Sequence, residues 1–115
     1  MMRFEMADLV TARERAGRPY HEFLRVPALS AGVYMLPAGG TDPQEPHTED
    51  EVYYVVAGAG RIAVAGEDAP VQAGSLVFVP AHVPHHFHAI SAGLTILVFF
   101  APAEYSARAA KAADV

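Results

Sequence analysis

Residues 39–58 read GGTDPQEPHTEDEVYYVVAG and combine the most acidic stretch of the chain with the start of a β-rich run. In an extended strand, side chains of the same parity share one face. Glu45, His47 and Glu51 then lie on the same face as Tyr53. Two carboxylates and an imidazole can therefore converge on one side of this segment. One histidine among several acidic residues is also typical of a solvated loop, and without further context this stretch favours that plainer interpretation.

A second informative stretch, residues 79–88, reads VPAHVPHHFH and holds four of the six histidines of the chain. Its two prolines restrict the backbone that leads into His85, which suits a preset ligand better than an irregular surface loop. Strand alternation places His85 on one face and both His86 and His88 on the opposite face. We therefore expect His86 and His88 at the exterior of the protein or at an interface.

The composition indicates one globular domain without thiol chemistry. The chain has 115 residues, of which 52% are hydrophobic and 18% are charged, so we expect a real core rather than disorder. The absence of cysteine excludes disulfides, thiolate metal sites and a cysteine nucleophile. The net charge of −5 argues against nucleic acid as a partner, because nucleic-acid binding needs a basic surface.

The sequence carries no sign of a membrane segment or an export signal. The apolar stretch at residues 94–102 is far shorter than the roughly 20 residues that a membrane helix needs. Acidic residues interrupt the start of the chain, where a signal peptide would have an apolar core. We therefore expect a soluble, cytoplasmic protein that does not bind membranes.

Turn signals divide most of the chain into short runs of β-forming residues. Turns that contain glycine or proline recur from residue 37 to residue 93, and the runs between them include EVYYVV, RIAVA and LTILVFF. This spacing predicts an all-β fold, a sandwich or a barrel, built mainly of antiparallel strands. No interior window shows the helical period that a βαβ unit requires.

We divide the chain into three parts. Residues 1–30 are an N-terminal arm, with a short helix that Asp8 caps and a strand that follows it. Residues 31–102 are the β-barrel, and the alanine-rich residues 103–115 are a C-terminal helical tail. The side chains expected inside the barrel are medium-sized and uncharged: Val55, Ile62, Val64, Val77, Val79, Ile96 and Val98.

For several aromatic residues, the sequence pattern leaves open whether the side chain lines a cavity or belongs to the core. Tyr53, Phe87 and Phe99 could line a cavity, although aromatic side chains in a small barrel are more often part of the core. Tyr34 and Met35 are neighbours in a predicted strand, so only one of the two can face inward.

The two histidine-containing stretches resemble the two motifs of the cupin superfamily. The first motif, G-x5-H-x-H-x3,4-E-x6-G, matches Gly39 to Gly58 at every spacing, with Glu45 in place of the first histidine. The second, G-x5-P-x-G-x2-H-x3-N, matches Gly74 to Ala89, with His82 where glycine is usual and Ala89 where asparagine is usual. Fifteen residues separate the motifs, as in small single-domain cupins.

The resemblance implies a cupin-type double-stranded β-helix, or jelly-roll barrel, with one divalent transition metal near its centre. His47, Glu51 and His85 match ligand positions of the family, and Glu45 occupies the fourth. Either Glu45 is a ligand, in a site that is neutral overall with a divalent ion, or it points away. The second case leaves two histidines, one carboxylate and open positions, which is typical of non-haem Fe(II) oxygenases, with Mn, Ni, Zn and Co as alternatives.

The remaining candidate residues receive smaller roles. An alternative register with His86 and His88 as the ligand pair breaks the spacing of the second motif. His82 is expected in a solvated loop, at most near the mouth of a pocket, and His21 lies outside both motifs without an assigned role. A carboxylate or phosphate substrate would need a cation, and Arg25 and Arg61 are the arginines that could reach the barrel.

Three functions are compatible with this sequence. The first is a metal-dependent enzyme that acts on a small organic molecule, with dioxygenase-like chemistry favoured. The second is a non-catalytic, metal-dependent module that binds or senses a small ligand. The third is a structural cupin without metal, which the departures at Glu45, His82 and Ala89 suggest. The resemblance also implies a homodimer, because small cupins often pair through barrel faces.

Overall fold

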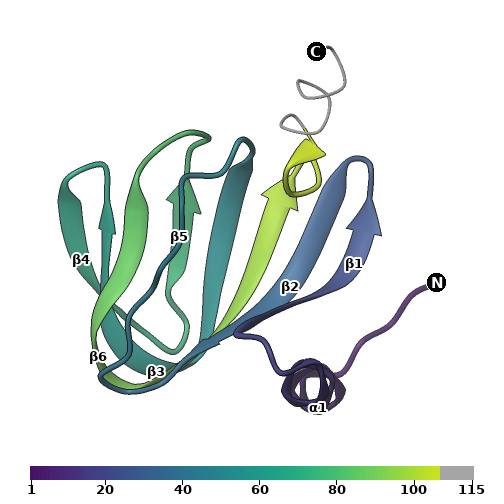
Figure 1. Ribbon diagram of the computed structural model, residues 1–115, viewed down its shortest axis with the longest axis horizontal. Helices are drawn as coiled ribbons and strands as arrows, with labels where there is room; N and C mark the ends of the chain where they lie inside the picture. The colour runs from purple at the N-terminus through teal and green to yellow at the C-terminus, as the bar shows by residue number, and fades with distance from the viewer. Residues whose placement is uncertain (107–115) are drawn as a thin grey trace.

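Six strands form one antiparallel sheet in the computed structural model, which describes residues 1–106 (Figure 1). In chain order the strands are β1 (Tyr20–Val26), β2 (Leu29–Leu36), β3 (Asp50–Val64), β4 (Glu67–Gln72), β5 (Leu76–Val79) and β6 (His85–Ala101). The order across the sheet is β1-β2-β6-β3-β4, and β5 pairs with the first part of β3. The sheet curls around an apolar core, so the predicted all-β barrel of antiparallel strands is confirmed.

Strands β3 and β6 are longer than the sequence runs predicted, because each joins two of those runs into one bent strand. The pairing between them shifts register three times from Val55 to Arg61. Gly58 lies at this bend with φ +96°, and a Cβ atom there would lie 2.1 Å from the Gly93 carbonyl oxygen. The glycine that ends the first motif therefore allows the close approach that bends the two longest strands.

The N-terminal arm packs on the same sheet. Helix α1 (Met6–Ala16) lies against β1 and β2, and it ends at Gly17, whose N–H donates to the carbonyls of Arg13 and Glu14 (Figure 1). The sequence predicts Asp8 as the cap of this helix, but the cap position is Glu5. The helix begins at Met6, so Asp8 lies in its first turn, where its carboxylate interacts favourably with the positive end of the helix. No helix within residues 1–106 is long and apolar enough to span a membrane.

The predicted C-terminal helix falls mainly on residues 107–115, which lie outside the described residues. Just before them, residues 103–106 follow β6 and are fixed to the barrel by backbone contacts. The Ala103 N–H donates to the Pro27 carbonyl, and the Glu104 N–H donates to the Ser30 hydroxyl. This short C-terminal segment therefore has a defined place beside the barrel.

The interior agrees with most of the predicted core. Five of the seven expected residues are buried, and Val64 and Val77 pack against them while remaining partly exposed. Tyr53 and Phe87 belong to the core, whereas Phe99 is only half-buried, since its neighbour Phe100 takes the inward face. On the outer face, β5 exposes the apolar side chains of Leu76 and Phe78. The expected homodimer stays a prediction.

Candidate metal centre

The fold brings together three residues that are far apart in the sequence. His47 lies in the loop before β3, Glu51 is the second residue of β3, and His85 is the first residue of β6. Glu51 pairs with Val79 at the end of β5, so the short turn after β5 delivers His85 next to Glu51. Potential ligand atoms of His47, Glu51 and His85 all lie within 4.8 Å of one another, and all three residues are buried. We call this group the metal centre.

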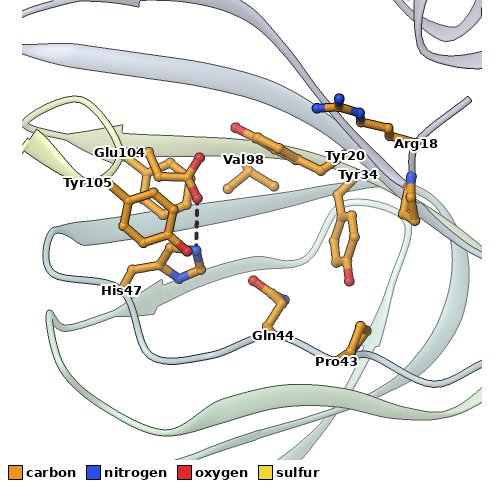
Figure 2. A pocket seen from close by; sticks show the side chains of 11 residues that line it. Arg18, Tyr20, Tyr34, Pro43, Gln44, His47, Val98, Glu104 and Tyr105 are labelled. Atoms are coloured by element: carbon orange, nitrogen blue, oxygen red, sulfur yellow. Dashed lines mark ion pairs between the residues drawn. The ribbon is translucent and has the colours of Figure 1, made fainter. Parts of the chain in front are cut away.

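Hydrogen bonds outside the group orient both imidazoles. The Nδ1–H of His85 donates to the Val83 carbonyl at 2.8 Å, which leaves Nε2 directed at Glu51 Oε1, also at 2.8 Å. His47 places Nε2 2.9 Å from Glu104 Oε2 (Figure 2). Its Nδ1 therefore faces Glu51 Oε1, at 3.3 Å. Such outer partners fix the tautomer of a metal-binding histidine.

The inward-facing atoms of the centre contact only one another. Nδ1 of His47, Nε2 of His85 and both carboxylate oxygens of Glu51 are buried, and beyond the His47–Glu51 and His85–Glu51 contacts they have no partner among the described residues. Two imidazole lone pairs and a carboxylate repel one another when they face the same point, so a cation must lie between them. That cation can be a proton or a metal ion. The donor set and its unpaired atoms therefore fit the divalent metal that the cupin resemblance implies.

The electrostatics of the metal-free centre point the same way. Burial lowers the pKa of His47, but the carboxylates of Glu104 and Glu51 outweigh it and raise this pKa to about 9. Burial also acts to lower the pKa of His85, and Glu51 again reverses the direction. The pKa of Glu51 is lowered, because both histidines overcome the opposing effect of its burial. The centre therefore holds positive charge strongly.

Glu45, the fourth predicted ligand, lies outside this group. Its side chain is exposed, while the neighbouring Gln44 turns inward, where its carbonyl accepts a hydrogen bond from the Tyr53 hydroxyl at 3.0 Å. Because the loop places residue 44 rather than residue 45 beside the cavity, strand parity does not hold this far before β3. The role of Glu45 as a ligand stays a prediction.

The other histidines of the second motif lie away from the centre. His82 and His86 are exposed, and His88 contacts Asp68 on the outer surface. The opposite faces of His85 and His86 are as the strand alternation predicts. The structure leaves His21 partly exposed in β1.

Backbone geometry explains the residue types that are usual at two positions of the second motif. His82 and Ala89 both have positive φ, +66° and +47°. This region favours glycine and tolerates asparagine, which are the residues that cupins usually carry at these positions. The departures at His82 and Ala89 therefore concern the backbone conformation at these positions. Neither side chain belongs to the metal centre.

Sequence reasoning missed the residues that cover His47 from the C-terminal segment. Glu104 pairs with the His47 ring, and Tyr105 stacks on it with a centroid distance of 5.3 Å and an interplanar angle of 25°. The Tyr105 N–H donates to the buried carboxylate of Glu49, which fixes the segment in place. In the sequence, Glu104 and Tyr105 belong to the start of a predicted alanine-rich helix. No local pattern there indicates their long-range contacts with His47 and Glu49.

A pocket of about 450 Å³ opens beside the metal centre (Figure 2). His47, Glu104 and Tyr105 form one end, and Arg18, Tyr34 and Pro43 lie toward the other. Its size is in the range of small-molecule sites. A molecule in this pocket would contact the rim of the metal centre at His47.

Comparison with known proteins places the chain in a family. The model of the cupin domain family matches residues 32–100. An uncharacterised protein of Streptomyces coelicolor is 46% identical over 104 residues, which cover 90% of this chain and 99% of that protein. Among solved structures, the protein TT1209 of Thermus thermophilus is similar with a TM-score of 0.70 and 25% identity, covering 90% of this chain and 99% of that one.

A larger enzyme shares the fold as well. Salicylate 1,2-dioxygenase of Pseudoaminobacter salicylatoxidans, solved with gentisate, is similar with a TM-score of 0.69 and 22% identity. The match covers 87% of this chain and 32% of the dioxygenase chain, so it concerns the fold alone. The family match spans more than half of the chain and includes both motifs and all three residues of the metal centre. The chain belongs to the cupin domain family.

Proposed function

We propose that this protein is a metal-dependent cupin that acts on a small organic molecule. His47, Glu51 and His85 hold one divalent transition metal, and the adjoining pocket holds the molecule. The observation that carries the proposal is the set of buried nitrogen and oxygen atoms that face one another at the centre and have no partner outside it among the described residues. Burying such atoms without a partner is costly, and a metal ion satisfies all of them at once.

The donor set suits several metals. Two imidazoles and one carboxylate with open positions are typical of non-haem Fe(II) sites, and Mn, Ni, Zn and Co accept the same donors. A metal bound there would supply Lewis-acid or redox chemistry to a molecule beside it. Salicylate 1,2-dioxygenase uses the same fold, so dioxygenase-like chemistry is the version of the proposal to test first.

The surrounding residues prepare the site for this role. Glu104 holds the His47 ring, and the Val83 carbonyl holds the His85 ring, so little reorganisation is needed when the metal binds. Tyr105 and Phe100 both pack against the His47 ring, which is buried. The pocket beside them offers an approach for a small molecule.

Metal analysis tests the proposal directly. Protein purified without an affinity tag should contain close to one transition metal per chain, or take it up from Fe(II), Mn(II), Ni(II), Co(II) or Zn(II). Failure to take up any of these metals would favour a structural cupin. Oxygen consumption by the Fe(II) form with small acids, diketones and phenols then separates a dioxygenase from the alternative, a module that binds its ligand without turnover.

A further inference from the structure

The pocket beside the metal centre has an uneven distribution of charge. Most of its wall is apolar or aromatic, with Val98, Phe100 and Tyr105 among the lining residues. Polar side chains lie mainly at its two ends, as Figure 2 shows, with His47 and Glu104 on one side and Arg18 on the other. The polar groups that remain without a partner in this wall indicate which ligand it fits.

The acidic groups near the pocket are already engaged. Asp42 accepts hydrogen bonds from the Tyr34 hydroxyl at 2.6 Å, from the Gln44 amide at 2.8 Å and from the Phe87 N–H at 2.9 Å. Glu104 is paired with His47. Neither carboxylate therefore calls for a cationic group on a ligand.

Arg18, by contrast, is a cation without a counterion. Within residues 1–106 no carboxylate pairs with its guanidinium. Its backbone is nevertheless fixed, because Arg13 donates to the Arg18 carbonyl at 3.0 Å and the Met35 N–H donates to the Pro19 carbonyl. The guanidinium is exposed at the pocket, where an entering anion can reach it.

The arginines that the sequence suggested for this role are used elsewhere. Arg25 pairs with Glu22 and also donates to the Glu104 carbonyl, which helps to hold the C-terminal segment. Arg61 pairs with Asp68 on the outer surface. Arg18, which lies in the turn between α1 and β1, takes their place at the pocket.

Tyr20 adds a hydrogen-bond donor. Its hydroxyl is buried and has no partner among the described residues, and in Figure 2 it points toward the side of the pocket where Glu104 lies. Burial raises the pKa of Tyr20, and the charges of Glu104 and Glu22 add to this effect, so the hydroxyl keeps its proton. The ring lies over Gly32, where any Cβ atom would collide with it. The donor is therefore held in place.

We propose that this pocket binds a small organic carboxylate with an apolar or aromatic body. The carboxylate lies at Arg18, and the apolar body fills the space between Arg18 and His47, where the Tyr20 hydroxyl can donate to a further polar group of the ligand. The assignment of this ligand as substrate rests on the proposed function, since the far end of the molecule then lies beside the metal. The anion subsite itself needs no metal.

Benzoate and benzamide are a matched pair of probes, because they have the same shape and differ in charge. Their dissociation constants are measured by ligand-observed NMR or calorimetry, with metal-free and with Zn(II)-loaded protein. We expect benzoate to bind about fivefold more tightly than benzamide, the gain of one solvent-accessible ion pair. Arg18→Gln should remove this preference, and Arg18→Lys should keep part of it.

Arg15→Gln is the control, because Arg15 is an exposed cation of the same helical arm that does not line the pocket. It should leave the preference for benzoate unchanged. Tyr20→Phe should also leave the preference for benzoate unchanged, because the Tyr20 hydroxyl points away from Arg18, and it should not lower the melting temperature, since it removes an unpaired buried hydroxyl.

Three results would overturn the proposal: no binding of either probe, equal affinity for both, or an equal loss in Arg15→Gln and Arg18→Gln. Its failure is distinguishable from that of the proposed function. A preference for benzoate that depends on Arg18, in protein that takes up no metal, supports the anion subsite and contradicts the metal-dependent function. Stoichiometric metal uptake without that preference does the reverse.

Discussion

Two clusters of histidine and carboxylate groups lie on opposite faces of this barrel, and they differ in almost every physical respect. The metal centre is buried, and its inward-facing atoms contact one another but no other described residue. The second cluster, which we call the outer cluster, consists of Arg61, Asp68 and His88. Its side chains are 35–44% exposed, and Asp68 is paired with both of its neighbours.

The difference shows that burial, and not the number of histidines, prepares a site for chemistry. Water screens the outer cluster, so its ion pairs contribute little. At the centre water is excluded, and the same types of group shift one another's pKa values strongly. His85 belongs to the centre and His88 to the outer cluster, although three positions separate them.

Removal of His85 should have the largest effect on this contrast. In His85→Ala one of three donors is lost, so metal affinity should fall by more than the roughly 10- to 100-fold that a change outside the ligand shell costs. Metal content after dialysis, measured by mass spectrometry, checks this. The matched variant His86→Ala changes an exposed neighbour and should retain the metal. Loss of metal in His86→Ala with retention in His85→Ala would mean that the predicted register is wrong.

Glu104 tests whether a residue outside the ligand group belongs functionally to the centre. Glu104→Gln keeps the size of the side chain and a hydrogen-bond acceptor for His47, but it removes the negative charge beside the His47 ring. We expect Zn(II) affinity to fall by about tenfold, at the lower end of the range for outer-shell partners, with little change in fold. Competition with a chromophoric chelator measures it. Asp68→Asn makes the same change in the outer cluster and should leave Zn(II) affinity unaltered.

The stability of the metal-free protein should depend on pH, because the pKa values of His47 and Glu51 at the centre differ between the folded and unfolded states. The pKa of His47 is about 9 in the folded protein and about 6.5 when unfolded, so its stabilising effect is complete below pH 6.5 and disappears as pH rises through 9. The pKa of Glu51 is lowered, so its contribution is present above its usual value of 4.5 and disappears in acid.

Thermal unfolding of the metal-free protein from pH 4 to 10 measures both effects. The melting temperature should be highest between about pH 4.5 and 6.5 and should fall by several degrees toward pH 9. His47→Gln should flatten the fall on the alkaline side. A profile in which His47→Gln keeps the full alkaline slope would place the titrating group elsewhere.

The sequence predicted the centre better than its surroundings, for a physical reason. Motif spacing reports local backbone requirements, such as the bend at Gly58 and the strand that carries Glu51, and these requirements position the residues of the centre. The contact between Glu104 and His47 joins residues that are far apart in the chain and leaves no periodic signal. The position of Arg18 at the pocket was not predicted for the same reason, since only the packing of the N-terminal arm brings it there.

The smallest effect should come from His88→Ala. His88 and Asp68 are both more than a third exposed, so solvent already competes for their ion pair and its loss exposes no buried charge. Arg61 also remains beside Asp68 at 2.6 Å and keeps the pKa of that carboxyl low, with His88 making the lesser contribution. We therefore expect the melting temperature to change by no more than about 3 °C, a surface-type effect, and metal affinity not to change. A loss of metal affinity comparable to that of Glu104→Gln would show that the outer cluster is coupled to the centre across the sheet. Burial alone would then not identify the histidines of this barrel that serve its function.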